Sequence, residues 1–239
     1  MKTVLSLIFL IILIACTWSG YKKGLIMGIF SLLAFVVSVY GANLLAGTYS
    51  GEVVDALRPF ASGFVEVNIV DKSVRPAMGM DDANLSVSDY FSQNPGKEEK
   101  YCVMTYQYMG IHPSTSEQMA EEALDYADKN GVDITDAVVE VLCRRVAFVG
   151  AFILLFMMLL IALTALLNIP NLSFKIPNMD LLNDVGGTVM GLLLGVGLCL
   201  VIGWGMKFLG LIFPQEELAN TFLLSWFMDR TVLVRFLGI

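Results

Sequence analysis

Residues 181–210 read LLNDVGGTVMGLLLGVGLCLVIGWGMKFLG, and this segment decides the class of fold. After Asp184 no acidic or basic residue occurs from position 185 to position 206, a run of 22 residues. A helix rises about 1.5 Å per residue, so a run of this length can cross the hydrocarbon core of a bilayer. We therefore predict a transmembrane helix over residues 185–206.

Small residues recur at every fourth position of this predicted helix. The row consists of Gly187, Gly191, Gly195, Cys199 and Gly203. Residues spaced by four lie on one face of a helix, and a face of small residues lets a second helix approach closely in lipid, where association depends on van der Waals packing. Glycine is common in membrane helices in general, but five small residues in one row favour a helix-packing face.

The composition is that of an integral membrane protein. Hydrophobic residues make up 56% of the chain and charged residues only 15%, and the mean hydropathy is +0.72, all outside the usual range of soluble domains. The net charge of −7 combines −11 from residues 48–142, which hold 17 acidic and 6 basic residues, with +4 from the rest of the chain. No basic run interleaved with aromatic residues is present, so we expect no nucleic-acid partner.

The first 50 residues predict a helical hairpin in the membrane. Residues 3–19 and 24–50 carry no charge, and the turn between them, residues 20–24, reads GYKKG. Lys22 and Lys23 cannot lie in hydrocarbon, and basic residues in short loops tend to stay cytoplasmic, so this turn favours an N-terminus outside. A second row of glycines four apart consists of Gly20, Gly24 and Gly28. This row predicts close packing between the hairpin arms or against the later glycine row.

A lipoprotein signal is an alternative interpretation of the N-terminus. Residues 13–16 read LIAC after a short basic start and an apolar run, which resembles a lipobox with Cys16 as the lipidated residue. A second apolar stretch begins directly after the turn, however, and a signal peptide does not require one. The hairpin is therefore the simpler prediction.

Two segments of the sequence resemble the colicin V production protein (CvpA) family. The first is the GYKKG turn followed by Leu25, Ile29, Ser31 and Leu32, and the second is LLNDVGG at residues 181–187 with the glycines that follow it. The resemblance covers roughly residues 1–47 and 137–239. It implies a bacterial inner-membrane protein with a role in toxin or colicin V production and export, or in broader envelope function, without a defined reaction.

Residues 48–142 form a polar insert that is too long for a connecting loop. Apolar residues at near-helical spacing predict an amphipathic helix over residues 51–64 near the membrane surface. Turn signals dominate residues 65–101, and residues 101–109 are short and strand-prone. Ser114 and Glu117 form a capping-box pattern that predicts a helix ending at Asn130-Gly131. Asp133 or Thr135 then starts a helix that enters the membrane without a break.

The second half of the chain predicts a second membrane hairpin. Residues 146–167 form the third span, Asn168-Ile169-Pro170 ends it, and the fourth span is the glycine-rich helix. After Pro214 the aromatic residues suit an interfacial helix. They are Phe222, Trp226, Phe227 and Phe236.

We therefore predict an all-α integral membrane protein with four transmembrane helices in two hairpins, a polar and mainly helical extramembrane insert, and a C-terminal interfacial helix. Its predicted parts are the first transmembrane hairpin at residues 1–47, the acidic insert at 48–142, the second hairpin with the glycine strip at 143–213, and the amphipathic tail at 214–239.

No pattern of catalytic or cofactor-binding residues occurs in the sequence. His112 is the only histidine and, beside Pro113, we interpret it as an exposed loop residue. With Cys102 and Cys143 it offers three possible ligands, but their spacing fits no zinc motif. The Walker, Gly-x-Ser-x-Gly and His-Glu-x-x-His motifs do not occur. We expect no enzyme activity, no cofactor and no bound metal.

The distribution of charges gives conflicting indications about which side of the membrane holds the insert. The basic turn places the insert outside, whereas a plain count over Lys2, Arg144, Arg145 and the other basic residues favours the reverse. We favour the extracytoplasmic side because the first hairpin often dominates orientation. Cys102 and Cys143 would then have the opportunity to form a disulfide.

The expected function is that of a membrane accessory protein. Its partners would be the lipid bilayer and other membrane or envelope proteins, with self-association as a further option. The predicted spans carry glycine faces and no charge near mid-membrane, which suits assembly better than ion coupling. The alternative is a small membrane transporter or channel subunit, which would require a polar path through the spans.

Overall fold

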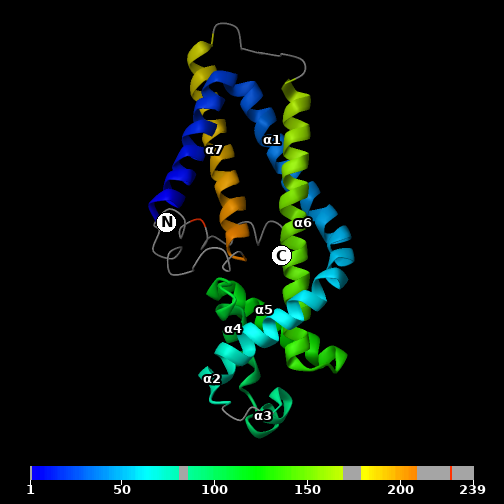
Figure 1. Ribbon diagram of the computed structural model, residues 1–239. Coiled ribbons are helices and arrows are strands. Elements are labelled where there is room, and N and C mark those ends of the chain that lie inside the picture. Colours follow the sequence, from blue (N-terminus) through cyan, green and yellow to red (C-terminus); the bar gives the residue numbers. More distant parts are fainter. Residues whose placement is uncertain (1, 81–85, 169–178, 209–226, 228–239) are drawn as a thin grey trace. The chain divides into compact units, whose positions relative to one another are not determined.

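The computed structural model describes residues 2–80, 86–168, 179–208 and 227, and every regular element in these residues is a helix (Figure 1). The elements are α1 (Lys2–Phe64), the π-helix η1 (Val65–Val74), α2 (Arg75–Met78), α3 (Val87–Gln93), α4 (Glu98–Tyr108), α5 (Pro113–Asn130), α6 (Ile134–Asn168) and α7 (Asp180–Met206). The prediction of an all-α chain is confirmed for the described residues.

Three helical segments of the described chain are long and apolar enough to cross a membrane. They are Val4–Met78, which runs from α1 through α2, and the helices α6 and α7. Many large apolar side chains on these segments are exposed, for example Leu154 and Ile161, at 60% and 62% of their full area. Such an apolar surface is unusual for a soluble protein and normal where lipid is the solvent.

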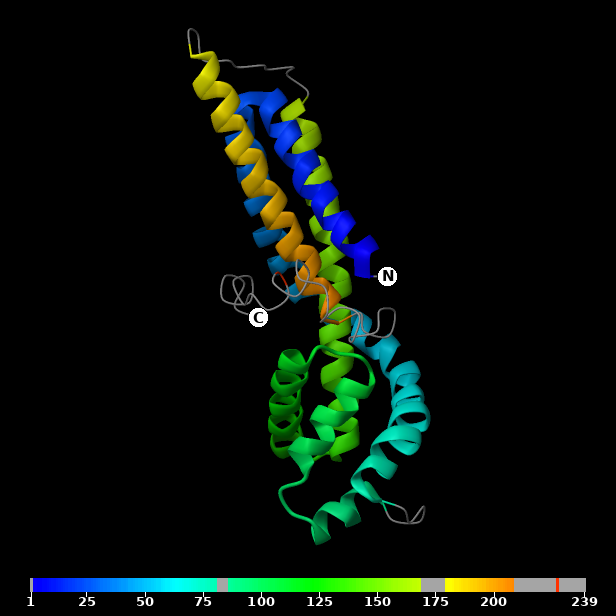
Figure 2. The same cartoon turned by 90° about the vertical axis from the view of Figure 1, so that its left-hand side faces the viewer.

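The first of these segments turns back at a single residue. Gly24 has φ 79° and ψ 177°, which lie outside the helical region, while the residues on both sides continue as helix. Figures 1 and 2 show α1 reversing direction within its blue, N-terminal part, and Gly24 is the non-helical residue that divides α1 into a first and a second arm. The predicted turn of five residues is wrong in its length, because a glycine with positive φ reverses the chain within one residue.

The described chain forms two compact units. Of the described residues, unit 1 comprises 2–46, 151–168, 179–206 and 227, and unit 2 comprises 47–80, 86–150, 207 and 208. Both α1 and α6 contribute residues to each unit. In unit 1, aromatic rings pack between α1, α6 and α7: Phe35 lies edge-on to Phe156 with ring centroids 5.8 Å apart, and Phe152 lies edge-on to Trp204 at 5.2 Å.

Unit 2 has its own core, built around two buried tyrosines of α4. Tyr101 and Tyr106 are fully buried. The hydroxyl groups of Tyr101 and Thr135 lie 3.0 Å apart, and the hydroxyl of Tyr106 donates to the carbonyl of Val138 at 3.0 Å. The strand-prone prediction for residues 101–109 is therefore wrong. These tyrosines have high strand propensity, but their contacts with α6 are made from a helix, and tertiary packing overrides propensity.

The turn-rich prediction for residues 65–101 is also wrong for most of the segment. It contains η1, α2, α3 and the start of α4. The buried face of η1 consists of Val65, Ile69, Val70 and Val74. This face packs into the core of unit 2, so local turn signals are overruled by burial of an apolar face.

The sequence predicts the end of α5 correctly, but its prediction for the start of α5 is wrong. The residue before α5 is His112, with Pro113 as the first helical residue and no side-chain cap, so the predicted cap at Ser114 is wrong. The Ser114 hydroxyl instead lies 2.9 Å from the Nδ1 atom of His112. The end of α5 at Asn130, with Gly131 at φ 62°, is confirmed.

The start of α6 is confirmed as well. The Asp133 carboxylate accepts the N–H of Thr135 at 3.1 Å, and the helix continues unbroken from Ile134 to Asn168. Most of the predicted loop before α7 and all of the predicted tail, apart from Phe227, lie outside the described residues.

Candidate functional site

The reversal at Gly24 is fixed by a contact with the first turn of α7. Asn183 is 1% exposed, and its side-chain Oδ1 accepts a hydrogen bond from the N–H of Leu25 at 3.1 Å. The first N–H groups of a helix have no partner within the helix, so this bond caps the second arm from another element. A Cβ atom at Gly24 would lie 2.6 Å from the amide atoms of Asn183. Only glycine therefore fits both the conformation and the space.

The other end of the Asn183 amide is buried without a partner. Its Nδ2 atom makes no hydrogen bond within the described residues. A buried polar group left unpaired costs about 1–3 kcal/mol. The bond to Leu25 is therefore made in a crowded, buried position, where loss of the Asn183 acceptor would leave the Leu25 N–H unpaired.

Below this turn the two glycine rows meet directly. We define the glycine seam as Gly20, Gly24, Gly187 and Gly191. A Cβ atom on Gly20 would lie 2.7 Å from the Cα atom of Gly191, and a Cβ atom on Gly187 would lie 2.8 Å from the Cα atom of Gly24. These are backbone atoms, which cannot move aside as a flexible side chain can. The seam brings the first arm and α7 into backbone contact.

The remaining glycines of the two rows contact side chains. A Cβ atom on Gly28 would lie 2.8 Å from the Cβ atom of Met190, and one on Gly195 would lie 3.1 Å from the Cβ atom of Cys16. Gly203 lies against Phe227, at 3.3 Å from its Cβ atom. The contacts of Gly195 and Gly203 are looser than those of the seam, whereas the Cβ atom of Met190 beside Gly28 has little freedom to move aside.

The structure also reveals contacts that the glycine spacing does not indicate. Gly186 and Gly197 lie outside the rows, but added Cβ atoms would lie 2.7 Å from the side chains of Leu25 and Phe35 respectively. Asn183 was recognised only as part of a motif. A polar residue one turn before a glycine row, inside an otherwise apolar helix, is the signal by which its capping role could have been found.

The predicted turn lysines lie at the reversal. Lys22 is exposed, and its Nζ atom lies 5.4 Å from the centroid of the Trp18 ring. Lys23 is half-buried. The two segments that carry the family resemblance, residues 20–32 and 181–187, therefore contact each other around this turn through Asn183 and the seam.

The two candidate disulfide cysteines are free thiols in the structure. Cys102 of α4 and Cys143 of α6 are both buried. Burial raises the pKa of the Cys102 thiol to about 12, and the nearby Glu98 carboxylate acts in the same direction. A thiol with such a pKa stays protonated near neutral pH and is a poor nucleophile and a poor metal ligand. Both are therefore separate core thiols in this structure, and the disulfide in an oxidising compartment stays a prediction.

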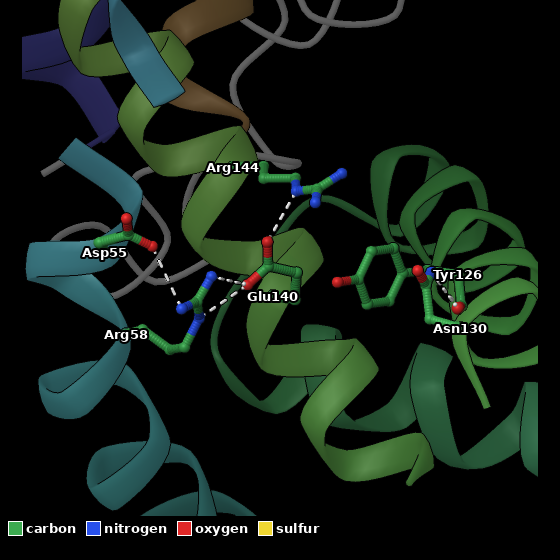
Figure 3. Close-up of polar contacts among 6 residues, drawn as sticks. All are labelled: Asp55, Arg58, Tyr126, Asn130, Glu140 and Arg144. Atoms are coloured by element: carbon green, nitrogen blue, oxygen red, sulfur yellow. Dashed lines mark hydrogen bonds and ion pairs between the residues drawn. The ribbon is translucent and has the colours of Figure 1, made fainter. Parts of the chain in front are cut away.

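Unit 2 contains a cluster of ion pairs centred on one buried acid (Figure 3). Glu140 of α6 is 6% exposed; its Oε2 accepts the Nε–H of Arg58 at 2.9 Å, and its Oε1 accepts the Nε–H of Arg144 at 2.8 Å. Arg58 also pairs with Asp55 at 3.1 Å. We call Asp55, Arg58, Glu140 and Arg144 the Glu140 cluster. It joins the C-terminal part of α1 to α6.

The electrostatics of this cluster keep Glu140 ionised. Burial acts to raise the pKa of its carboxyl group, but the hydrogen bonds from Arg58 and Arg144 and their charges outweigh burial, so the pKa lies below the ordinary value. Arg144 also places its guanidinium 4.8 Å from the centroid of the Tyr126 ring. The charged groups of the cluster bond to one another, which suits a structural contact between α1 and α6 rather than a reaction.

Within the described residues, no group of three or more His, Cys, Asp or Glu side chains is placed to hold a metal ion. His112 directly precedes α5, and its backbone carbonyl accepts the N–H of Thr115 at 2.9 Å. No family model, curated protein or solved structure matches the chain. We therefore infer function from the packing, the polar contacts and the sequence resemblance stated above.

Proposed function

We propose that the chain is a bacterial inner-membrane protein of four spans, similar to the CvpA family, that supports toxin export or other envelope processes by docking other membrane or envelope proteins. The alternative, a small transporter or channel subunit, would have to move a solute itself. The two differ in what the interior of the membrane helices must provide. Docking needs a packed scaffold, and transport needs a polar path.

The reversal at Gly24 supports four crossings. Each arm of α1 is apolar on its membrane side and long enough to span, with Lys22 and Lys23 placed at the turn between them. The arms form the first hairpin, and α6 with α7 forms the second. An even number of crossings puts the N-terminus and residues 48–142 on one side and the lysine turn on the other. We place the insert outside, because the basic turn favours the cytoplasm.

The observation that carries the docking proposal is how the polar side chains of these helices are used. Ser31 and Ser38 donate to the carbonyl groups of Met27 and Ala34, one turn back in the same helix, at 2.8 and 2.7 Å. Thr17, Thr164 and Thr188 do the same in their helices. Hydroxyl groups bonded to their own backbone are not arranged to line a polar path. Together with the glycine seam, this favours a closed scaffold.

Reconstitution in liposomes tests docking against transport. We expect the purified protein to show no saturable flux of ions or small solutes above that of protein-free vesicles. A saturable flux would overturn docking and establish the transporter. In cells, deletion of the gene should reduce export of a colicin V-type toxin, and the unaltered gene should restore it.

A further inference from the structure

Unit 2 holds an apolar pocket of about 270 Å³ between the end of α1 and the first half of α6. Its α1 wall is formed by Leu57, Ala61 and Phe64, and its α6 wall by Leu142 and Val146. Phe60 lies at its margin and is 80% exposed. We call this the apolar pocket. A large aromatic side chain left open beside an apolar cavity indicates a surface that is covered by something apolar.

The chemistry of the lining limits the ligand. Every described residue that lines the pocket is apolar, apart from the weakly polar thiol of Cys143. A polar ligand would lose its hydrogen bonds to water here and find none in exchange, at a cost of about 1–3 kcal/mol for each group by mutational data. A hydrocarbon chain gains about 25 cal/mol for each Å² of apolar area it buries. The pocket therefore fits an alkyl chain.

The position of the pocket along α6 indicates where such a chain would come from. Leu142 and Val146 lie on the turn of α6 at which the charge-free run of residues 146–167 begins. Under the proposed membrane topology, on which this step rests, that turn lies at the boundary between hydrocarbon and headgroups. Acyl chains of lipids are the alkyl groups present at that depth at the highest concentration.

We propose that the apolar pocket binds one acyl chain of a membrane phospholipid. The folded state of unit 2 then includes a phospholipid as a bound ligand. The lipid is held by burial of its hydrocarbon chain in the pocket.

The test uses the full-length protein in vesicles of phosphatidylethanolamine and phosphatidylglycerol that contain a phospholipid with a photoreactive diazirine near the end of one acyl chain. After illumination, peptide mapping should show crosslinks enriched on residues 57–64 and 142–146 over the rest of the lipid-facing surface. Ala61→Trp fills the pocket. It should lower these crosslinks about tenfold, because lost burial of two methylene groups at ~0.8 kcal/mol each already accounts for that factor.

The matched control is Ala56→Trp, which adds the same side chain at an exposed position of the same helix. It should leave the crosslinks at the pocket unchanged. Equal labelling in Ala61→Trp, or a uniform spread of crosslinks in the unaltered protein, would overturn the proposal. Capture of detergent alone, or of a second copy of the chain at the pocket, would overturn it too.

Failure of this proposal and failure of the proposed function have different signatures. If the chain inserts into membranes and shows no solute flux but its pocket is not enriched in lipid crosslinks, only the lipid site is wrong. If Ala61→Trp does not fold, the crosslink map of the unaltered protein still decides. A chain that does not enter the bilayer at all contradicts the membrane assignment itself.

Discussion

Gly24 and Asn183 show how one backbone reversal can be fixed by two residues 159 positions apart in the chain. Gly24 supplies a positive φ and leaves room for the Asn183 amide, and Asn183 caps the helix that starts at Leu25. Neither residue can be replaced without losing one of these two functions. Both predictions at this scale follow from that pairing.

Gly24→Ala should destabilise the protein. A residue with a Cβ atom pays about 1–2 kcal/mol to adopt a left-handed backbone, and the new methyl group would clash with Asn183. The midpoint of thermal unfolding in mild detergent should fall. Gly51→Ala is the control, since nothing lies within 4 Å of a Cβ atom there, and alanine is favoured over glycine inside a helix by about 0.5–1 kcal/mol. An unchanged midpoint in Gly24→Ala would mean that the reversal does not depend on glycine.

Asn183→Leu should also destabilise, because the Leu25 N–H would lose its acceptor in a buried position, at a cost of about 1–3 kcal/mol. The expected reading is a lower unfolding midpoint together with faster amide hydrogen exchange at Leu25. Asn168→Ala removes an exposed amide at the end of α6 and should leave both values unchanged. Unaltered exchange at Leu25 in Asn183→Leu would show that the cap is not made.

At the scale of helices, two sets of contacts hold helices together: the glycine seam in unit 1 and the Glu140 cluster in unit 2. The seam depends on close backbone approach, and the cluster depends on charge. Because one is insensitive to pH and the other is not, they can be tested separately. Both involve α1, whose first arm carries the seam and whose last turns carry Asp55 and Arg58.

Gly187→Ala should separate α7 from the first arm. Overpacking of a tight contact costs about 1–3 kcal/mol, and the added methyl group would meet backbone atoms of Gly24. Thermal aggregation in detergent should begin at a lower temperature. Gly150→Ala makes the same change in α6, where a Cβ atom meets nothing within 4 Å, and should not lower it. Equal behaviour of the two variants would place the glycine row on the lipid-facing surface.

The Glu140 cluster should make unit 2 sensitive to acid. The folded pKa of Glu140 lies below its unfolded value, so its stabilisation is present above the ordinary glutamate pKa of about 4.3 and is lost as pH falls through the folded pKa. Glu140→Gln should therefore lower the urea midpoint at pH 7 and reduce its fall on acidification. Glu121→Gln, at an exposed position of α5, should match the unaltered protein. A Glu140→Gln curve with unchanged pH dependence would contradict the assignment.

At the scale of the whole molecule, the sequence predicts those features that depend on residues close together in the chain. Charge-free runs predicted the apolar helices. Glycines at every fourth position predicted residues of the seam, such as Gly20 and Gly191. The unbroken course of α6 was predicted because no breaker lies between Ile134 and Asn168.

Contacts between distant segments could not be predicted from pattern. The helical state of residues 101–109 depends on Tyr101 and Tyr106 meeting α6, and the cap on Leu25 comes from a residue of α7. Cys102 and Cys143 were paired on the basis of sidedness alone, whereas each is a buried thiol in the core of unit 2. The Glu140 cluster likewise joins Arg58 to an acid 82 residues later.

The central claim is that α1 crosses the membrane twice, and the accessibility of new cysteines tests it most directly. Lys22→Cys lies at the reversal and Lys72→Cys in the insert, both exposed, whereas Cys102, Cys143 and Cys199 are buried. The unaltered protein gives the background labelling. With a membrane-impermeant thiol reagent on intact spheroplasts, we expect Lys72→Cys to be labelled directly and Lys22→Cys only after lysis. Labelling of both in the same compartment would contradict the account, because α1 would then not fold back across the bilayer.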